Sequence, residues 1–302
     1  MARKVTTRTT PEQRREQAAA LQATIAEKVD VLRADEQWRA FLDVARGFHR
    51  YSLNNLILIW SQRPDATQVA GFRQWQARGR QVRKGERAIR IFGYATKKIT
   101  DDDAGDDEQT QTDENGQRVR VWFPLLAVFD LAQTDPVDPD TPDPADLVKH
   151  LTGADALGIV DAVTDFLTSR GWSLAREPIR GAANGYTAID GTNRVVVDAD
   201  VAPAQAAKTA LHEAAHVLLH ADLPDREYAE HRGVCETEAE SVAYVVAGLL
   251  GLDTSAYSIG YVAQWADADV DLIRSTAANV LRAAHALADA ITSDDNDTQV
   301  AA

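Results

Sequence analysis

The chain of 302 residues contains one cysteine, Cys235, and no long apolar run. A disulfide needs two thiols, so none can form within the chain, and such sparse cysteine use is typical of a reducing compartment. No stretch of about 18 consecutive apolar residues is present, which excludes a membrane-spanning helix. Residues 1–8 lack the apolar segment of a secretory signal. We therefore expect a cytoplasmic protein without a membrane partner.

Basic charge is scarce overall but concentrated in one part of the chain. The formal net charge is −14, yet residues 1–98 hold 20 Lys or Arg against 9 Asp or Glu. Residues 99–150 hold 3 against 14, and residues 151–302 hold 9 against 23. A strongly basic third in an acidic protein favours an anionic partner for that third. The alternative is that the basic part docks on the acidic part of the same chain.

The first part of the chain combines helical patterns with short alternating strands, which is typical of an α+β fold. We expect residues 1–134 to form one domain with helices and a small antiparallel sheet. Residues 81–94 predict a hairpin that turns at Lys84-Gly85. Residues 100–117 are rich in Asp and predict an acidic, mobile insertion.

A second domain is expected after a Pro- and Asp-rich linker at residues 135–146. Residues 147–292 predict a mostly helical domain that contains a hairpin, formed by residues 185–189 and 194–198 around an Asp-Gly turn. The polar residues 293–302 predict a disordered tail.

Residues 212–216 read His-Glu-Ala-Ala-His, an H-E-x-x-H motif. Residues four apart share one face of a helix, so His212 and His216 can present two imidazoles to one metal ion. Glu213 lies beside them, where a carboxylate can act as general base on a water at the metal. Apolar flanks favour a buried helix, in which polar side chains need partners. An amphipathic helix with surface histidines is the alternative interpretation.

A second apolar helix begins near three carboxylates, Glu236, Glu238 and Glu240. Glu236 and Glu240 share a face, and Glu238 points elsewhere. Their spacing after His216 resembles thermolysin-like gluzincins, in which the first carboxylate binds zinc and the later one orients a ligand histidine. The resemblance implies Glu236 as third ligand and Glu240 as its supporting partner. His220 is expected as a wall or supporting residue, because a fourth protein ligand would close the site.

The expected cofactor is one Zn²⁺ ion, although other divalent metals remain open. The alternative for the three glutamates is that they only favour a helix N-terminus. Tyr244, His220 and His231 are candidates for stabilising an oxyanion, and the sequence does not choose among them.

The N-terminal part resembles a known family. Residues 48–94 resemble the N-terminal domain of ArdC-type antirestriction proteins, and the resemblance rests on residues 51–55, 64–72, 75 and 79–86, with 128–134 similar to that domain's end. The C-terminal part resembles the zinc-metallopeptidase domain of ArdC and, more distantly, of ImmA/IrrE proteins. The resemblance covers roughly residues 35–285. It implies an antirestriction protein of a mobile genetic element that binds single-stranded DNA.

A single-stranded DNA partner requires cations for its phosphates and planar side chains for its bases. The candidate contacts are Arg73, Arg78, Arg80, Arg83, Lys84, Arg87, Arg90, Tyr94, Asn54 and Asn55. Trp60, Phe72 and Trp75 have apolar surroundings, and we expect them in the core instead.

The leading hypothesis is a zinc metallopeptidase domain, acting on a protein or peptide, joined to a single-stranded DNA-binding domain. In one alternative, a non-catalytic DNA-protecting protein uses the metal only to hold its second domain together. Structural zinc usually takes cysteine and histidine ligands, so the single cysteine and an idle Glu213 argue against it. In another, a regulatory protease cleaves a repressor when DNA is present as the signal.

Overall fold

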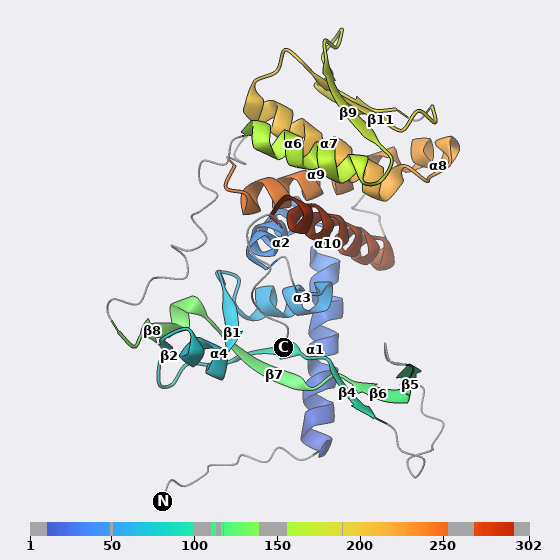
Figure 1. The fold of residues 1–302 in the computed structure, drawn as a ribbon. Coiled ribbons are helices and arrows are strands. Elements are labelled where there is room, and N and C mark those ends of the chain that lie inside the picture. The colour runs from blue at the N-terminus through green and yellow to red at the C-terminus, as the bar shows by residue number, and fades with distance from the viewer. Residues whose placement is uncertain are drawn as a thin grey trace, which may run out of the picture. The chain divides into compact units, whose positions relative to one another are not determined.

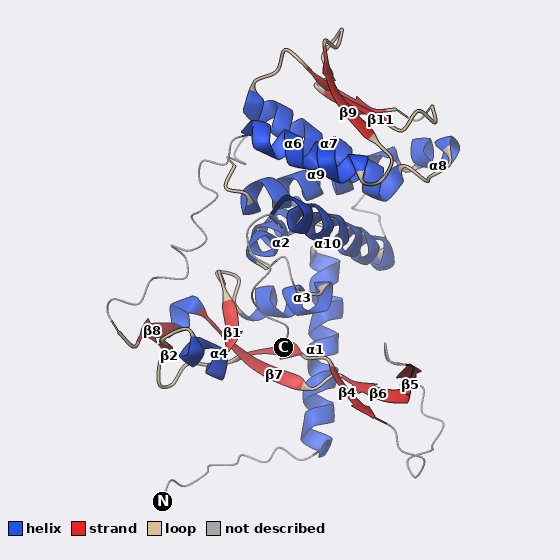
Figure 2. Cartoon of the chain, viewed as in Figure 1, coloured by secondary structure: helices blue, strands red, loops and turns tan. Residues whose placement is uncertain are grey.

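The computed structural model describes residues 11–48, 51–98, 110–112, 116, 118–138, 156–188, 190–252 and 269–292, and the chain divides into two compact units (Figure 1). The first unit comprises Met1–Glu27 and Ile57–Thr141, and the second comprises Lys28–Leu56 and Pro142–Ala302. The division falls within two helices, α1 (Pro11–Val31) and α3 (Leu53–Gln62). Figure 2 shows helices together with short strands, which confirms the α+β class.

The first unit contains short strands in three small sheets. Its elements after α3 are β1 (Val69–Gly71), α4 (Phe72–Ala77), β2 (Arg80–Val82), β3 (Ile89–Phe92), β4 (Ala95–Lys98), β5 (Thr110–Thr112), β6 (Arg118–Trp122), β7 (Leu125–Asp130), the 3-10 turn η2 (Leu131–Gln133) and β8 (Thr134–Pro136). The strands pair in the orders β1-β7-β3, β4-β6-β5 and β2-β8, and every pairing is antiparallel.

The predicted hairpin at residues 81–94 is wrong in its pairing. β2 pairs with β8, and β3 pairs with β7. Alternation indicates a strand but not its pairing partner, and the β2-β8 pair includes a side-chain contact from Arg80. Its Nε donates to Thr134 Oγ1 at 2.8 Å across the β2-β8 pair. The beginning of the segment predicted as a linker is therefore part of a sheet.

Two polar groups in the core of the first unit, an indole and a carboxylate, form hydrogen bonds with the backbone. Trp75 is fully buried with Ala70 and Val82, and its Nε1 donates to the Phe129 carbonyl at 2.8 Å. Asp130 is also fully buried and accepts backbone N–H bonds from Thr67, Gln68 and Ala132.

The core predictions for the large aromatics are mostly confirmed. Trp60 and Trp75 are buried, as expected. Phe72 is 43% exposed, so its predicted core position is wrong. It begins α4, and its ring meets the Phe129 ring at a centroid distance of 6.4 Å.

The predicted acidic insertion, linker and C-terminal tail fall mainly outside the described residues. Of residues 100–117, only 110–112, which form β5, and 116 are described. Residues 139–146 of the predicted linker and the predicted tail at 293–302 also lie outside them.

The second unit is mostly helical, as predicted. Beyond α2 (Asp35–Gly47), it contains α6 (Ala156–Thr168), β9 (Ser173–Glu177), β10 (Gly185–Thr187), β11 (Arg194–Asp198), α7 (Pro203–His220), α8 (Asp225–Glu230), α9 (Arg232–Leu249) and α10 (Val270–Thr292). β10 and β11 form the expected hairpin, and β9 adds a parallel strand on the far side of β11. α7 packs against α6, α9 and β10, and α9 also packs against α10 and α2.

Small side chains bring α7 and α9 close together. Ala210, Ala214 and Ala215 of α7 and Ala239 and Ala243 of α9 are fully buried. Short side chains at a helix contact allow a close approach of the two backbones. The polar residues carried by both helices are therefore brought within reach of one another.

Helix α2 packs within the second unit rather than with the strands that follow it in sequence. Trp38 Nε1 donates to Ser241 Oγ at 3.0 Å, and Tyr244 OH donates to Asp43 Oδ1 at 2.6 Å. The predicted domain limits stay a prediction, because a compact unit is not the same as an independently folding domain. No helix among the described residues is long and apolar enough to cross a membrane.

Candidate metal centre

Helix α7 carries the H-E-x-x-H motif on a buried stretch. The helix begins at Pro203, which suits a first helical position because its missing N–H would have no partner there. His212 Nε2 and His216 Nε2 lie 3.1 Å apart, as predicted from the four-residue spacing. His216 and Glu213 are buried, and His212 is partly buried.

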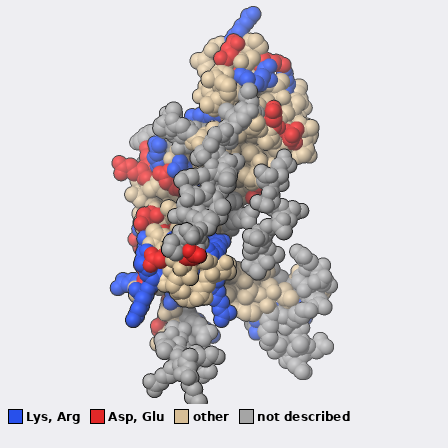
Figure 3. Space-filling model, turned by 60° about the vertical axis from the view of Figure 1, so that its left-hand side comes forward, with Lys and Arg blue, Asp and Glu red and all other residues tan. Residues whose placement is uncertain are grey.

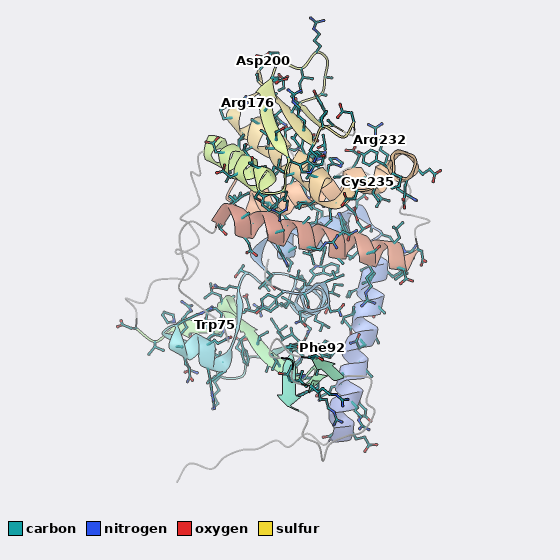
Figure 4. The ribbon with its side chains drawn as sticks, turned by 45° about the vertical axis from the view of Figure 1, so that its right-hand side comes forward. Trp75, Phe92, Arg176, Asp200, Arg232 and Cys235 are labelled. Atoms are coloured by element: carbon teal, nitrogen blue, oxygen red, sulfur yellow. The ribbon has the colours of Figure 1, made fainter. Side chains whose placement is uncertain are left out.

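Glu236 completes a group of three metal-binding side chains. Its Oε2 lies 3.5 Å from His212 Nε2 and 3.8 Å from His216 Nε2, and the three ligand atoms lie within 4.8 Å of one another. Glu236 lies in the first turns of α9, the helix whose Arg232 and Cys235 are labelled in Figure 4. The arrangement brings together all three residues predicted as ligands.

The donor set fits a divalent cation. Two imidazole nitrogens and a carboxylate oxygen are the usual ligands of a catalytic zinc site. If both rings are neutral with the proton on Nδ1, the lone pairs of His212 Nε2 and His216 Nε2 face each other. A cation between them removes that repulsion. The imidazoles of His212, first, and of His216 hold the pKa of Glu236 well below its usual range, so it is a carboxylate.

Glu240, which is predicted as a supporting partner, lies against His212. The His212 Nδ1 lies 3.2 Å from Glu240 Oε2, and Lys208 Nζ lies 3.1 Å from Glu240 Oε1. Burial lowers the pKa of His212, but hydrogen bonds with Glu236 and Glu240 outweigh it and raise the pKa to about 9. A metal that binds Nε2 displaces the proton from that atom, while the Glu240 carboxylate keeps the other proton on Nδ1.

His216 is supported by a longer set of contacts, in which Glu238 takes part. His216 Nδ1 lies 3.0 Å from His220 Nδ1, and His220 Nε2 lies 2.8 Å from Glu238 Oε2. Asn279 Nδ2 on α10 donates to Glu238 Oε1 at 2.9 Å. His220 thus lies beside the site as predicted, whereas no role at the site is predicted for Glu238.

Glu213 lies in a cleft of about 460 Å³ that also reaches the ligand side chains. Thr187 on β10 donates its hydroxyl to Glu213 Oε2 at 2.8 Å. Gly185 keeps the strand close to the helix, because a Cβ there would lie 2.4 Å from Thr209 Cγ2 and 3.4 Å from Glu213 Cγ. β10 is an edge strand, so the cleft has an unpaired strand along one side.

Tyr228 of α8 is a cleft residue that the sequence did not indicate. Its OH lies 3.4 Å from Glu236 Oε1, and its ring lies 6.1 Å from the His216 ring, centroid to centroid. Burial first, then the negative charge of Glu236, raises the pKa of Tyr228 to about 12. No rule of sequence spacing connects helix α8 with the H-E-x-x-H motif of α7. The position of Tyr228 in the cleft was therefore not predictable from the sequence.

Two of the proposed oxyanion-stabilising residues lie elsewhere. Tyr244 is buried against α2 and bonds to Asp43, and His231 is exposed and does not line the cleft. Only His220 of the three lines it.

The predicted DNA-contact residues are divided between the two units. Asn54 and Asn55 belong to the second unit, where Asn54 Oδ1 accepts a bond from Arg274 at 3.3 Å. The other eight lie in the first unit, where Figure 3 shows Lys and Arg side chains on the surface together with acidic ones. The exposed members are Arg73, Arg78, Arg83, Lys84, Arg87, Arg90 and Tyr94.

Arg78 lies over the Trp75 ring at 5.3 Å, and two more of these arginines form polar contacts within the protein. Arg80 is only 7% exposed and bonds to Thr134. Arg83 forms ion pairs with Glu86 at 3.0 Å and Asp135 at 3.2 Å. Its side chain is exposed, so these pairs are of the kind that contribute little free energy.

Two sequence families match the chain in succession. Residues 15–129 match the N-terminal domain of anti-restriction factor ArdC, and residues 158–257 match the IrrE N-terminal-like domain of the peptidase M78 family. The second unit therefore contains a peptidase-like domain. Because a region similar to the ArdC N-terminal domain precedes that peptidase-like domain, the chain resembles ArdC-type proteins.

Individual relatives are distant. An uncharacterised protein of Bacillus anthracis is 25% identical over 245 residues, which span 72% of this chain but 41% of the relative. The chain thus spans less than half the length of that relative. The metal-free structure of the antirestriction protein ArdC from plasmid R388 is 20% identical, covers 82% of this chain and 87% of its own, and superimposes with a TM-score of 0.47. Its Mn(II)-bound structure is 18% identical, covers 81% and 90%, and gives 0.45.

Proposed function

We propose that the second unit is a zinc metallopeptidase that hydrolyses peptide bonds in a protein or peptide substrate. One observation carries the proposal: His212, His216 and Glu236 converge on one point, and Glu213 lies beside them in the same cleft. Two imidazoles and one carboxylate leave a coordination position for water, which is the pattern of catalytic rather than structural zinc.

The chain's own residues supply the remaining parts of such a reaction. A divalent ion held by the three ligands supplies Lewis acidity toward a water molecule and the scissile carbonyl. Glu213 takes the proton from that water and returns it to the leaving amine. Thr187 holds the Glu213 carboxylate through its hydroxyl. The edge strand β10 offers backbone groups with which an extended peptide can pair.

A purely structural metal explains less of the site. It would give no role to Glu213, a buried carboxylate that is held by Thr187 and faces a cleft. Burying a carboxylate is costly, and a site with no chemistry would have no need of it. Cys235 is buried, but it does not belong to the ligand group.

Substitution Glu213→Gln tests this proposal. The amide keeps the size of the side chain and its bond with Thr187 but cannot act as a base at neutral pH. We expect unchanged zinc content by mass spectrometry of the metal. Cleavage of a proteome-derived peptide library, with new N-termini read by mass spectrometry, should be lost. If the variant cleaves as the native protein does, Glu213 is not the base.

We also propose that the first unit binds single-stranded DNA, as an antirestriction-type protein of a mobile element. The specific observation is a group of exposed aromatic side chains around the ends of β4, β6 and β7. Tyr94 is 66% exposed, Phe123 59% and Trp122 41%. The Tyr94 and Phe123 rings lie edge to face at 6.1 Å. Exposed aromatic groups of this kind usually mark an interaction site.

Basic residues accompany these aromatics in the same sheet. β4 pairs with β6 so that Lys97 lies opposite Arg120 and Ala95 opposite Trp122, and Arg118 is exposed further along β6. Phosphate neutralisation by cations together with base stacking on aromatic rings is the usual chemistry of single-strand binding. Sequence reasoning named Tyr94 but missed Trp122 and Phe123.

Fluorescence anisotropy with a labelled dT20 oligonucleotide and the full chain tests the DNA proposal. Each stacked base contributes about 1–3 kcal/mol, so loss of one base stacked on this ring pair in Tyr94→Ala/Phe123→Ala should weaken binding roughly 5- to 150-fold. Tyr186→Ala, an exposed tyrosine of the second unit, is the matched control. Unchanged affinity in the double variant would mean that this surface serves another partner, such as a protein.

The two activities need not depend on each other. If protection of DNA from restriction survives Glu213→Gln, the protein protects DNA without using its peptidase chemistry. If cleavage of peptides requires added dT20, the protein is a regulatory protease that responds to single strands. Metal analysis of the purified protein decides between zinc and another divalent ion such as manganese.

A further inference from the structure

Behind His216, four side chains from three helices form a continuous set of hydrogen bonds. His216 and His220 belong to α7, Glu238 to α9 and Asn279 to α10. The distances are 3.0 Å between the two Nδ1 atoms, 2.8 Å from His220 Nε2 to Glu238, and 2.9 Å from Asn279 to Glu238. Both histidines and Glu238 are buried.

The donor and acceptor of every hydrogen bond in this set follow if His216 binds a metal through Nε2. If His216 offers the Nε2 lone pair to a metal, its proton is on Nδ1, which donates to His220 Nδ1. His220 then carries its proton on Nε2 and donates it to Glu238 Oε2. Asn279 donates to the other oxygen, Oε1. Each donor meets one acceptor, so no partner in the set is left unsatisfied.

The two ligand histidines are therefore supported differently. His212 Nδ1 meets a carboxylate directly, that of Glu240, which also meets Lys208. His216 Nδ1 meets a second imidazole, and the carboxylate lies one residue further away. A carboxylate usually contacts a metal-binding histidine directly and orients it. Here the imidazole of His220 lies between His216 and the carboxylate of Glu238.

The burial of Glu238 suggests that its contact with His220 has a role beyond stabilising the fold. It is 5% exposed, and its side-chain oxygens contact His220 and Asn279. A buried carboxylate with so few partners is costly for stability. A leucine of similar size would fill the same space without that cost. The fold alone thus gives little reason for a carboxylate at this position.

We propose that His220 and Glu238 are positioning residues, which fix the ring and the proton of His216 so that Nε2 faces the metal. The proposal rests on the proposed metal site, but not on peptide hydrolysis. Glu238 accepts from His220, His220 accepts from His216, and Asn279 holds Glu238 in place.

Metal affinity measured by competition with a chelator tests the proposal. Supporting partners of this kind are typically worth about 10- to 100-fold in metal affinity. Glu238→Leu should weaken Zn²⁺ binding by about that factor, and His220→Phe should do the same. Glu238→Gln keeps an oxygen for His220 and offers an amide to a rotated Asn279. It should therefore retain nearly native affinity.

A second readout separates positioning from general stability. Ser241→Ala removes the buried hydrogen bond with Trp38 on the same helix α9 and does not touch the histidines. It should lower the melting temperature of the metal-free protein without changing Zn²⁺ affinity. The Co²⁺ absorption spectrum should change in Glu238→Leu and His220→Phe but not in Ser241→Ala. The double variant His220→Phe/Glu238→Leu should lose no more affinity than His220→Phe alone, because the two residues act in series.

Each outcome decides the question. Native affinity and a native Co²⁺ spectrum in Glu238→Leu overturn the proposal, as do additive losses in the double variant. If the native protein binds zinc but cleaves no peptide, the peptidase proposal fails and the positioning proposal is judged by affinity alone. If the native protein binds neither Zn²⁺ nor Co²⁺, both proposals are wrong.

Discussion

The hydroxyl of Thr187 donates to Glu213 Oε2 at 2.8 Å, so the edge strand β10 holds the proposed base on helix α7. A base must keep one orientation to take a proton efficiently. The Thr187–Glu213 bond links two elements that are separate in sequence, and it makes the position of the strand relevant to the chemistry.

Thr187→Val should lower kcat while leaving zinc content unchanged. Valine keeps the shape of threonine but has no hydroxyl to donate. A hydrogen bond to a charged group contributes about 1.5–3 kcal/mol, so loss of orientation should reduce kcat roughly tenfold to a hundredfold. The measurement is turnover of a peptide that the native protein cleaves. Thr187→Ser, which keeps the hydroxyl, should retain most activity, and equal loss in both variants would point to packing instead.

Gly185→Ala should disturb the same strand by overpacking. The added Cβ would lie 2.4 Å from Thr209 Cγ2 and 2.9 Å from the Val196 carbonyl, so β10 or α7 must move. Overpacking of this kind typically costs about 1–3 kcal/mol, or roughly 2–12 °C in Tm. Thermal unfolding checks it, with Tyr186→Ala at the exposed neighbouring position as control. An unchanged Tm would show that strand and helix are farther apart than described.

Glu236→Ala should remove most of the bound metal. Two imidazoles alone form an incomplete site, so zinc retention after gel filtration should fall sharply while the fold persists by circular dichroism. The control must be chosen with care, because Glu238 supports His216 through His220. Glu227, exposed on α8, is the better control, and Glu227→Ala should keep native metal content. Full zinc retention in Glu236→Ala would remove Glu236 from the ligand set.

The carboxylates of α9 show what sequence reasoning could and could not reach. Helical periodicity places Glu236 and Glu240 on one face, and both indeed lie near His212. The same periodicity turns Glu238 away from that face. It cannot say what covers the other face, and there Glu238 meets His220 of α7 and Asn279 of α10.

Long-range pairing explains the other differences. Trp38 and Ser241 form a buried hydrogen bond across 203 residues of sequence, and no local pattern indicates such a partner. The partner of β2 was also misjudged, because β8 lies in a segment whose prolines and aspartates suggest a linker. The spacing of residues within one helix thus predicted which side chains share a face. Contacts between different helices and strands could be identified only from the fold.

Arg80 and Arg90 should respond differently to substitution, although both are predicted DNA contacts. Arg80 is buried and bonds to the hydroxyl and carbonyl of Thr134, so Arg80→Ala removes the donor to two oxygen atoms of a buried residue. The expected loss is about 1–3 kcal/mol in the free energy of unfolding. Arg90 is exposed, and its alanine variant should stay within about 0.5 kcal/mol of native stability.

Binding to dT20 at several salt concentrations completes this comparison. If Arg90 neutralises one phosphate, Arg90→Ala should weaken binding and reduce the slope of log K against log salt by about 0.7. Arg80→Met, which keeps the apolar stem, should leave that slope native, because a buried guanidinium cannot reach a phosphate. A reduced slope in the Arg80 variant, with unchanged unfolding, would mean that β2 and β8 separate to admit the DNA backbone.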